Sequence, residues 1–569
     1  MYYLALASDY DGTLAHEGGV PPSTLNAIRR LKETGRKFLL VTGRELPDLM
    51  RVFPDIDICD LVVAENGALL YFPRTKEERP IAPAPPQGFV DRLREHGVAP
   101  ISVGHSIVAT WTPHETAVLE TIQEMGLELQ IIFNKGAVMV LPAGVNKASG
   151  LAAALDAIGL SAHNVAAIGD AENDHAFLRV SGFSVAVANA LPAVKDSADL
   201  TTRGARGEGV EELVDLLVED EAALGPTARA HVPLGKKADG ETITISPRSI
   251  VLIAGSSGIG KSTLAKAITE KLAEAQFHFV VFDPEGDYEG LENAVTVGDT
   301  SVPPVKAQIM ELLANPRQNV VVNTLALQLG ERPAFFADLM PELVSLRATT
   351  GRPHWLLIDE AHHLMPRSRD SESLALSRDM PATVLITVHP EAVSADALQL
   401  VDTVFALGPQ ADRIMEEFCA IAGEAPPAAL PVPGRETVLY WHRRQGGPAE
   451  LVEVEKPHQA HLRHTRKYAE GNLDEERSFY FRGPAGAMNL RVHNLVMFCQ
   501  VAEGIDDTTW MHHLRNHDYS AWFRGRIADD ALAEEAEQVE ADPSLDASAS
   551  RHLIIEAVRR RYTAPASAR

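Results

Sequence analysis

Short runs of apolar residues alternate with longer amphipathic stretches over roughly the first 220 residues of the chain. The runs at residues 4–7, 37–41, 61–64 and 165–168 have the length and composition of buried parallel strands. The stretches between them, such as residues 22–34, have the apolar spacing of amphipathic helices. The alternation predicts an open α/β sheet, in which functional side chains gather at the carboxyl ends of the strands.

A second α/β pattern begins near residue 243, after a stretch that has no periodicity. Residues 221–242 mix Pro, Gly, Ala and charged residues, which predicts a linker. The pattern that follows predicts an α/β domain over residues 243–455, and residues 456–569 are mainly helical in character. The chain is therefore expected to contain a first domain at residues 1–220, a linker, a second α/β domain and a helical C-terminal module.

Charge and cysteine content indicate the cellular compartment of the protein and the partners that it disfavours. The net charge of −26 disfavours broad adhesion to nucleic acid or to an anionic membrane. The cysteines Cys59, Cys419 and Cys499 stand far apart, so they form neither a disulfide framework nor a zinc motif. The N-terminal apolar run is short and leads directly into Asp9, as a strand does and a signal peptide does not. These features predict a cytoplasmic protein without a membrane span.

Two acidic residues follow the first predicted strand, where Asp9 and Asp11 belong to the run Asp-Tyr-Asp-Gly-Thr. A carboxylate nucleophile divides phosphate-ester hydrolysis into two easier steps through an acyl phosphate. A second carboxyl group in the same turn can protonate the leaving oxygen and then deprotonate water. A lone Asp-x-Asp is usually a turn or a helix start, so the pair needs support from elsewhere in the chain.

That support comes from groups at the ends of other predicted elements. Thr42 follows the strand at residues 37–41, and Lys147 opens a predicted helix. Asp170 and Asp174 follow the strand at residues 165–168. The hydroxyl and ammonium groups suit phosphoryl oxygens, and the two carboxylates are hard ligands of the kind that Mg²⁺ prefers. Polar groups in this order after predicted strands favour a catalytic interpretation over a structural one.

Residues 1–215 resemble the haloacid-dehalogenase (HAD) phosphohydrolases, and within them the Cof-type branch. The resemblance is carried by Asp9–Thr13, Thr42-Gly43-Arg44, Glu65-Asn66-Gly67-Ala68, Lys147, Gly169–Asp174 and Val185–Ala190 with Lys195. It implies a Rossmann-like domain with a small α+β cap at about residues 72–140 that selects a small phosphorylated metabolite. By the same resemblance Asp9 is the nucleophile, Asp11 is the acid and base, and Mg²⁺ is bound by Asp9, Asp11, Asp170 and Asp174.

A phosphate-binding loop opens the second α/β domain. Residues 249–254 form an apolar strand, and a helix is expected at residues 261–274. Between them lies a complete GxxxxGK[ST] motif, in which backbone N–H groups face the phosphates of ATP, the lysine reaches the β and γ oxygens, and the serine binds Mg²⁺. The motif consists of Gly255, Ser256, Ser257, Gly258, Ile259, Gly260, Lys261 and Ser262.

Two later strands supply partners for this loop. The apolar residues 355–358 lead into Asp359 and Glu360, which suit a water-mediated contact with Mg²⁺ and the orientation of the attacking water. The apolar run at residues 382–388 can bring Thr387 or His389 near the γ-phosphate. The adjacent His362 and His363 also invite a zinc interpretation, but neighbouring histidines at such a turn point to opposite sides.

Residues 243–455 resemble the HerA–FtsK-like motor ATPases at the phosphate-binding loop, at Asp359-Glu360 and at the run Asp283–Tyr288. The domain is short, leaving little room for the insertions with which motors grip DNA. An arginine finger is not assigned among Arg332, Arg347, Arg352, Arg367 and Arg369. The resemblance implies ATP binding and an oligomer formed through this domain.

The C-terminal module contains a basic run and an aromatic group. The basic run comprises Lys456, His458, His461, Arg463, His464, Arg466 and Lys467 and is expected to form salt bridges with acidic surfaces. The aromatic residues, which include Trp510, Trp522 and Phe523, are more typical of a small core than of a base-stacking platform.

The sequence as a whole predicts an Mg²⁺-dependent phosphatase of phosphomonoesters fused to a domain that binds and hydrolyses ATP. Two alternatives stay open. One is an ATP-driven, HerA-like assembly on nucleic acid, with the first domain as its effector or end-processing phosphatase. The other is a regulator in which ATP occupancy controls the phosphatase. Nucleic acid is the less favoured partner because the chain is acidic.

Overall fold

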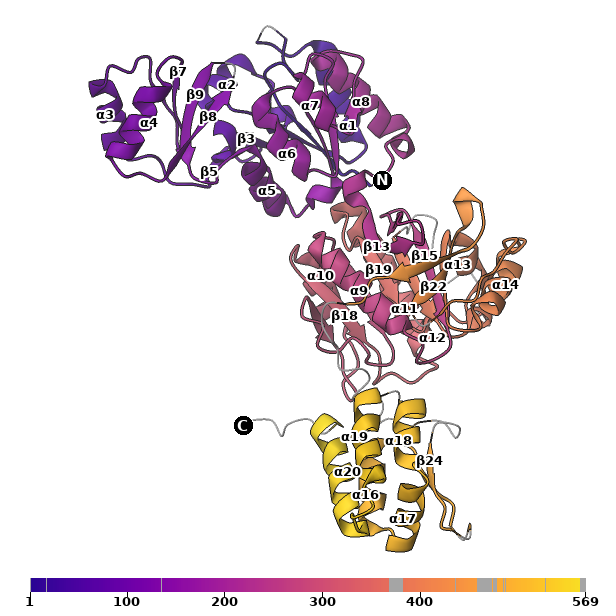
Figure 1. Cartoon of the computed structure of the whole chain (residues 1–569). Coiled ribbons are helices and arrows are strands. Elements are labelled where there is room, and N and C mark those ends of the chain that lie inside the picture. Colours follow the sequence, from indigo (N-terminus) through magenta and orange to yellow (C-terminus); the bar gives the residue numbers. More distant parts are fainter. Residues whose placement is uncertain are drawn as a thin grey trace. The chain divides into compact units, whose positions relative to one another are not determined.

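A computed structural model describes residues 2–562 except 17, 135, 368–381, 435, 458–472, 474–477, 485, 487 and 528 (Figure 1). The chain divides into two compact units, residues 1–456 and residues 457–569. The first unit contains both α/β regions, each built around its own sheet. Among the described helices, none is long and apolar enough to cross a membrane.

The first region is built on an eight-stranded sheet with the order β12-β11-β10-β1-β2-β3-β4-β5. The six strands from β12 to β3 are parallel, and β4 and β5 extend the sheet as antiparallel strands. All residues of β1, β3 and β10 are buried, as their apolar sequences predict. In chain order the strands are β1 (Ala5–Ser8), β2 (Lys37–Val41), β3 (Leu61–Ala64), β4 (Leu69–Phe72), β5 (Glu77–Pro80), β10 (Val165–Gly169), β11 (Phe183–Ala186) and β12 (Leu200–Thr201).

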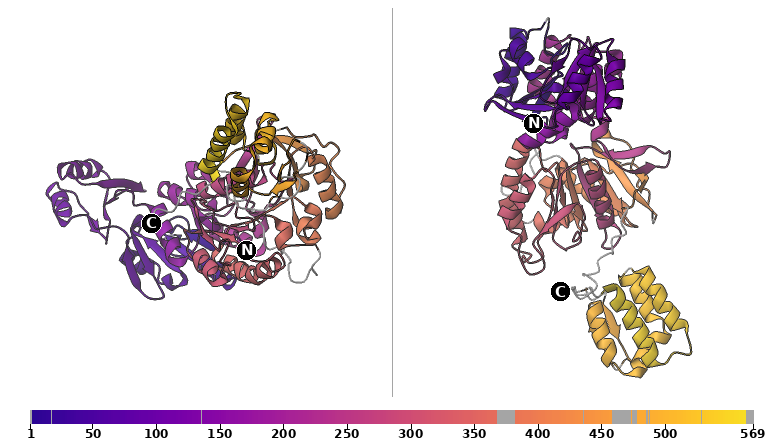
Figure 2. Two further views of the ribbon diagram at one scale, coloured as in Figure 1. Left: turned by 90° about the horizontal axis from the view of Figure 1, so that it is seen from below. Right: turned by 90° about the vertical axis from the view of Figure 1, so that its left-hand side faces the viewer.

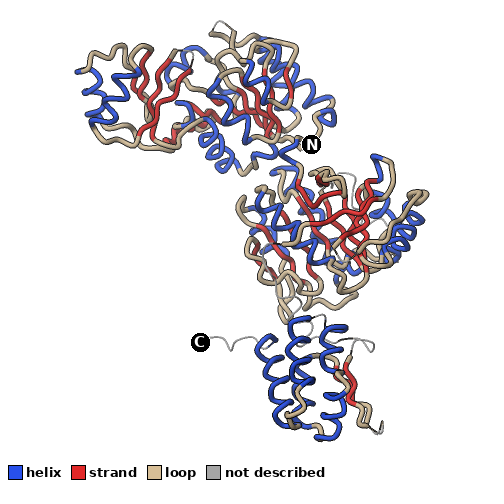
Figure 3. The backbone as a smooth tube through the Cα atoms, in the orientation of Figure 1, coloured by secondary structure: helices blue, strands red, loops and turns tan. Residues whose placement is uncertain are grey.

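Helices connect the parallel strands and cover the sheet, as Figure 3 shows. Two of them, α1 and α8, pack against each other. Each presents an apolar side inward; in α1 that side includes Leu25, Ile28 and Leu31. The helices are α1 (Pro22–Glu33), α2 (Leu46–Val52), α5 (Lys147–Ile158), α6 (His175–Val180), α7 (Pro192–Ser197) and α8 (Gly207–Glu219).

A small α+β cap is inserted between β5 and α5. Its four-stranded antiparallel sheet has the order β6-β7-β9-β8, with β6 (Ser102–Val103), β7 (Val108–Trp111), β8 (Leu129–Asn134) and β9 (Ala137–Pro142). The helices α3 (Gln87–Glu95) and α4 (Glu115–Glu124) cover one face of this sheet (Figure 1). The cap therefore begins later than the residue 72 expected from the sequence, because β5 pairs with β4 and continues the core sheet.

The second region contains an eleven-stranded sheet with the order β14-β13-β23-β22-β21-β15-β20-β19-β16-β18-β17. The strands from β21 to β17 are parallel, and those from β14 to β22 (Thr437–His442) are antiparallel. The parallel strands are β15 (Ile250–Gly255), β16 (Phe279–Asp283), β17 (Ala294–Val297), β18 (Asn319–Asn323), β19 (Trp355–Ile358), β20 (Thr383–Thr387) and β21 (Thr403–Leu407). Its longer helices are α9 (Lys261–Glu274), α10 (Lys306–Ala314), α11 (Arg332–Thr350) and α14 (Ala411–Ala422), and the shorter ones are α12 (Ala361–Leu364) and α13 (Ala395–Leu400).

The expected linker at residues 221–242 is wrong over its second half. Residues Val232–Lys237 form β13, which pairs with β23 (Glu450–Val454) and with β14 (Thr242–Ile245). Val232 and Leu234 are buried in the core of the second region. Pro233 and Gly235 interrupt the apolar pattern, and the register shifts between them. Such interruptions are tolerated in a strand near the edge of a sheet, where the sequence pattern is weak.

The C-terminal unit combines a hairpin with helices that lie side by side in Figures 1 and 2. The hairpin joins β24 (Phe479–Phe481) to β25 (Leu490–Val492), and the helices are α16 (Leu495–Gly504), α17 (Asp507–Arg515), α18 (Asp518–Trp522), α19 (Asp530–Ala541) and α20 (Ala547–Tyr562). Trp510 stacks on Tyr519 with ring centroids 4.4 Å apart, and both are buried. The aromatic residues thus form a core and not an open stacking surface. Of the basic run, all but Lys456 lies outside the described residues.

Candidate active site

The carboxyl ends of three neighbouring parallel strands bring the predicted groups of the first region together. Asp9 follows β1, Thr42 follows β2, and Asp170 follows β10, with β1 between the other two strands. Lys147 enters from the start of α5, where the side chain of Asn146 caps the helix by accepting the N–H groups of Ala148 and Ser149. The helix cap therefore fixes the point from which Lys147 reaches the strand ends.

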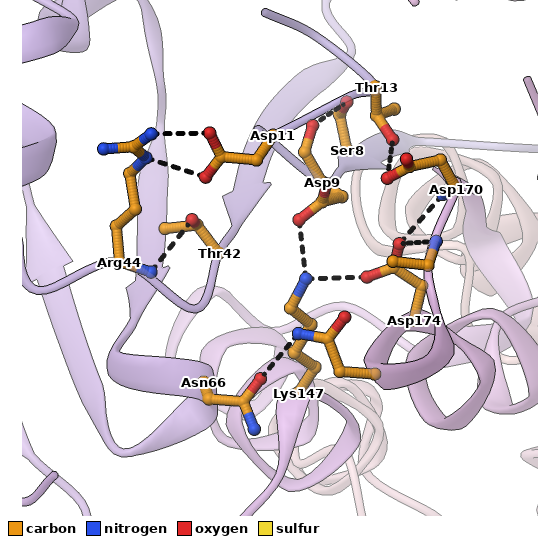
Figure 4. A network of polar contacts seen from close by, with 12 residues as sticks. Ser8, Asp9, Asp11, Thr13, Thr42, Arg44, Asn66, Lys147, Asp170 and Asp174 are labelled. Carbon is orange, nitrogen blue, oxygen red and sulfur yellow. Dashed lines mark hydrogen bonds and ion pairs between the residues drawn. The ribbon is translucent and has the colours of Figure 1, made fainter. Parts of the chain in front are cut away.

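Lys147 lies at the centre of a buried ion network (Figure 4). Its Nζ is 2.5 Å from Asp9 Oδ1 and 2.6 Å from Asp174 Oδ1. All three side chains are at least nine-tenths buried. Burial raises the pKa of Asp9 to about 7, with Asp174 acting in the same direction and Lys147 against it. Burial opposes the charge on Lys147, but Asp174 and Asp9 together raise its pKa above the ordinary value.

Three carboxylates converge at this point. Oxygen atoms of Asp9, Asp170 and Asp174 lie within 4.8 Å of one another, and this is the only such acidic or metal-ligating group among the described residues. Asp174 Oδ2 accepts the backbone N–H groups of Asp170 and Ala171, and Asp170 Oδ1 accepts the hydroxyl of Thr13. The ammonium of Lys147 contacts two of these three carboxylates, and a divalent cation with oxygen preference fits the donor set.

Asp11 is oriented away from this group in Figure 4. Both of its carboxylate oxygens accept hydrogen bonds from Arg44, at 2.7 Å from Nε and 2.6 Å from Nη2. Arg44 also pairs with Asp48, and its backbone N–H donates to Thr42 Oγ1 at 3.2 Å. The structure therefore places Asp11 beside Arg44, an interaction that the sequence left unassigned.

A turn after β3 links the strand ends to the cap. Glu65 and Asn66 are buried and have φ values of 52° and 53°, a conformation that is costly outside glycine and common at functional sites. The carboxylate of Glu65 accepts the N–H groups of His105 and Ser106 in the cap, each at 2.8 Å. Asn66 accepts a hydrogen bond from Asn173 at 3.1 Å. Sequence reasoning gave these residues no role, because only their motif, not their contacts, is visible in the chain.

The phosphate-binding loop of the second region has the expected strand–loop–helix form. Gly258 and Gly260 have φ values of 79° and 112°, which only glycine adopts without strain. Residues 256–259 are exposed, whereas Lys261 is buried and donates to the backbone oxygen of Ser256 at 3.1 Å. Ser262 donates to Asp287 Oδ2 at 3.0 Å. Asp287 is a functional candidate that the sequence did not single out.

Acidic residues line the sheet edge beside this loop. The strands β16 and β19 are adjacent and parallel, so Asp283 and Asp359 leave the sheet side by side. Burial raises the pKa of Asp283 to about 7, helped by Asp287 and opposed by three backbone N–H groups. Burial also raises the pKa of Asp359 well above its ordinary range, with Asp287 and Glu360 adding to the effect. Glu360 has a φ of 41°, another strained position at this edge.

The candidates for an arginine finger lie in different surroundings. Arg347 donates to the backbone oxygens of Pro353 and His354, and Arg352 donates to that of Gly159. Burial lowers the pKa of Arg332, while Glu285 and Asp283 act against that shift, which places Arg332 on the acidic side of the sheet. Arg367 is described, and Arg369 lies outside the described residues.

Comparison with known proteins gives two family matches. The haloacid dehalogenase-like hydrolases match residues 6–114 and 120–214, and the central domain of the helicase HerA matches residues 243–346. The phosphoglycolate phosphatase of Methanothermobacter thermautotrophicus is 32% identical over 219 residues, covering 37% of this chain and 96% of that protein. Phosphoglycolate phosphatase 1 of Saccharolobus solfataricus is 29% identical over 232 residues, covering 37% and 95%.

A solved structure of similar form is a haloacid dehalogenase-like hydrolase from Bacteroides thetaiotaomicron. It has a TM-score of 0.34 and 18% identity, covering 38% of this chain and 99% of that one.

Proposed function

Through residues 6–214 this chain belongs to the haloacid dehalogenase-like hydrolase family, and we propose that this part hydrolyses phosphomonoesters through an aspartyl phosphate. The observation that carries the proposal is the buried contact of Lys147 with Asp9 and Asp174, next to Asp170. A nucleophilic carboxylate, a fixed ammonium and a site for a divalent cation are the parts that this chemistry needs.

In the proposed reaction Asp9 attacks phosphorus and the bond between phosphorus and the leaving oxygen breaks. Asp11 gives its proton to that oxygen, then accepts a proton from water as water attacks the aspartyl phosphate and releases inorganic phosphate. Lys147 and the hydroxyl of Thr42 hold phosphoryl oxygens throughout. The two nitrogens of Arg44 that hold the carboxyl group of Asp11 would keep it in place for both proton transfers.

Mg²⁺ is the proposed cofactor of this site. Asp9, Asp170 and Asp174 would hold it, and Asp174 also positions Asp170 and Lys147 through the hydrogen bonds described above. When bound, the ion neutralises the carboxylates and polarises the phosphoryl group. The carboxylate of Asp11, expected as a ligand, lies instead against Arg44.

The proposed substrate is a small phosphorylated metabolite. The cap, anchored by Glu65, adjoins the strand ends and would limit the size of what reaches Asp9. The relatives in the comparison are named phosphoglycolate phosphatases, which makes phosphoglycolate the first compound to test, followed by sugar phosphates.

For the second region we propose that ATP binds at residues 255–262 and is hydrolysed with the help of Asp359 and Glu360. The glycine conformations of the loop, the buried Lys261 and the acidic sheet edge support this proposal. The match to the HerA central domain favours an oligomer through this domain and keeps action on nucleic acid as the second candidate. ATPase activity that DNA stimulates, together with a ring in solution, would support the second candidate.

One experiment tests the proposed phosphatase and its dependence on ATP. Release of phosphate from a metabolite panel is measured with and without Mg²⁺ and ATP, for wild type, Asp9→Asn and Lys261→Ala. Loss of metabolite hydrolysis in Asp9→Asn alone would show independent sites, and loss in both variants would show that ATP controls the phosphatase. Full activity in Asp9→Asn would refute the proposed nucleophile.

A further inference from the structure

His362 lies between two groups that the proposed ATPase reaction needs. Its Nδ1 is 3.1 Å from Thr387 Oγ1 and 3.4 Å from Glu360 Oε2. The side chains of His362 and Glu360 are each only 13% exposed, so the contacts are shielded from solvent. The ring of His362 also meets that of His389 edge-on at 5.6 Å.

The positions of these residues follow from the sheet. Thr387 ends β20, and it pairs with Ala254 at the end of β15, one residue before the phosphate-binding loop. Glu360 follows β19, which is the neighbour of β20 on the other side. A γ-phosphate held by the loop would therefore lie near Thr387, with Glu360 on the far side of β20. His362 spans the distance between them.

A single nitrogen cannot satisfy both neighbours at once. Burial lowers the pKa of His362 to about 4, with His363 and His389 acting in the same direction, so the ring is neutral at pH 7. In a neutral imidazole, Nδ1 carries either a hydrogen or an available lone pair. With a hydrogen, it donates to the hydroxyl of Thr387 or to the carboxylate of Glu360. Without one, it accepts from Thr387 and offers Glu360 nothing.

We propose that His362 is a positioning residue that passes the state of Thr387 to Glu360. When the γ-phosphate accepts the hydroxyl hydrogen of Thr387, the neutral ring of His362 takes the tautomer that carries its hydrogen on Nδ1, and Nδ1–H then donates to Glu360 and orients its carboxylate toward the attacking water. When no phosphate is present, Nδ1 accepts the hydroxyl hydrogen of Thr387 and has no hydrogen to donate to Glu360. Hydrolysis is thereby linked to the presence of the γ-phosphate. The inference rests on the proposed ATPase function.

Zinc binding is the alternative role for these histidines. His362, His363 and His389 do not form a ligand group among the described residues, where the only such group is Asp9, Asp170 and Asp174. The Nδ1 atom of His362 is already within reach of an oxygen donor and acceptor, as a hydrogen-bonding relay requires.

The test uses the full chain and ATP with Mg²⁺. His362→Ala should lower kcat for ATP at least about tenfold, as expected for loss of a group that orients a general base, while the Kd for ATP changes less than twofold. His362→Asn restores an amide nitrogen near the position of Nδ1 and should recover most of kcat. The same change at the neighbouring histidine, His363→Ala, is the matched control and should leave kcat near that of wild type.

A double-mutant cycle separates this role from a merely structural one. If His362 acts through Thr387, then Thr387→Val and His362→Ala together should reduce kcat no further than the more damaging single variant. Additive losses, or an unaltered kcat in His362→Ala, would overturn the inference.

Failure of the proposed ATPase function can be distinguished from failure of the proposed role of His362. If wild type does not hydrolyse ATP and Lys261→Ala does not weaken ATP binding, the ATPase function itself is refuted. If wild type hydrolyses ATP and Glu360→Gln abolishes the activity while His362→Ala does not lower it, only the role of His362 is refuted.

Discussion

The two phosphate-handling regions of this chain hold their charges in opposite ways. In the first, Lys147, Asp9 and Asp174 are buried and paired with one another before any ligand arrives. In the second, residues 256–259 are exposed, and Gly258 and Gly260 give the loop a left-handed backbone conformation. The first site is thus preorganised by ion pairs, which suits the stabilisation of a transition state. The second is preorganised by its backbone, which suits the binding of a polyphosphate.

One property is nevertheless shared. Each region contains a buried carboxyl group whose pKa is raised to about 7, Asp9 in the first and Asp283 in the second. Lys147 acts against the rise in the pKa of Asp9, whereas backbone N–H groups of its own turn act against the rise in the pKa of Asp283. Excess negative charge at both sheet edges is consistent with the binding of divalent cations at each.

The largest expected effect is on the nucleophile. Asp9→Asn should lower phosphatase kcat by at least about a thousandfold, because an amide cannot form the acyl phosphate and the covalent route is lost. Steady-state phosphate release in Mg²⁺ measures the change. Nucleotide binding, followed by calorimetry, should stay at the wild-type level. A variant that retains a tenth of the activity would show that Asp9 is not the nucleophile.

The matching change in the second region is Lys261→Ala. It removes the one buried ammonium of the loop and should weaken ATP binding by about a hundredfold, as expected for the loss of charge-assisted hydrogen bonds. Titration calorimetry with ATP and Mg²⁺ measures the Kd. Because the exposed backbone groups of the loop remain, some affinity should survive, in contrast to the much larger loss of activity expected in the first site. Unaltered affinity would place ATP elsewhere.

The comparison also shows what the sequence could predict. Asp9, Thr42, Lys147 and Asp170 were found because each follows a predicted strand or opens a helix, and parallel strands end at one edge. The glycine loop was found because its motif is local. Secondary structure at the centre of both sheets was equally clear, since buried parallel strands are continuous apolar runs.

Other features depend on contacts that no local pattern encodes. The pairing of Asp11 with Arg44 joins residues 33 positions apart, and Glu65 reaches a cap loop 40 residues away. The bond from Ser262 to Asp287 and the bridge from His362 to Thr387 are of the same kind. Side-chain orientation decides each of them. The strand β13 was missed because Pro233 and Gly235 break its alternation.

Removing the ammonium of Lys147, at the centre of the buried ion network, should lower the stability of the first region. Lys147→Met leaves Asp9 and Asp174 buried without their cation, and breaking a buried ion pair costs about 3 kcal/mol or more. In EDTA the calorimetric transition of the first region should fall by roughly 6–12 °C, given about 2–4 °C per kcal/mol for a domain of this size. The exposed salt bridge partner Arg317, replaced by Met, is the control and should shift it by less than about 1 °C.

A change of similar size in stability is expected from pH. The pKa of Asp9 is 3.8 in its ordinary state and about 7 in the folded chain, so the folded state retains a proton that the unfolded state has lost between these values. Stability is therefore lost as the pH rises from about 4 to about 7, by up to about 1.4 kcal/mol per pH unit. Calorimetry in EDTA should show this slope in wild type and a reduced slope in Asp9→Asn. Asp283 supplies the slope that remains in the variant.

Mg²⁺ distinguishes the two carboxyl groups further. If the ion binds beside Asp9, it stabilises the carboxylate and should flatten the part of the slope that Asp9→Asn removes. A slope that is the same in wild type and variant, with or without Mg²⁺, would contradict a raised pKa for Asp9.

The smallest expected effect is a change in kcat/KM on replacing Arg44, which holds Asp11 with two nitrogens. Arg44→Lys keeps the positive charge but loses the fork that fixes the carboxylate, so the acid is less well placed. With an alkyl phosphate, whose leaving oxygen needs a proton, kcat/KM should fall about five- to tenfold, a modest share of what a general acid contributes. With p-nitrophenyl phosphate, whose leaving group departs without a proton, the same variant should lose less than about twofold.

The ratio of the two substrates is the informative quantity, because a general loss of structure would lower both rates together. Asp48→Asn is the matched control: Asp48 contacts the same guanidinium but not the proposed reaction centre, and its loss should leave the ratio near that of wild type. If Arg44→Lys slows both substrates equally, the arginine supports the fold of the loop. If only the alkyl phosphate is slowed, Asp11 is the acid and Arg44 determines where it points.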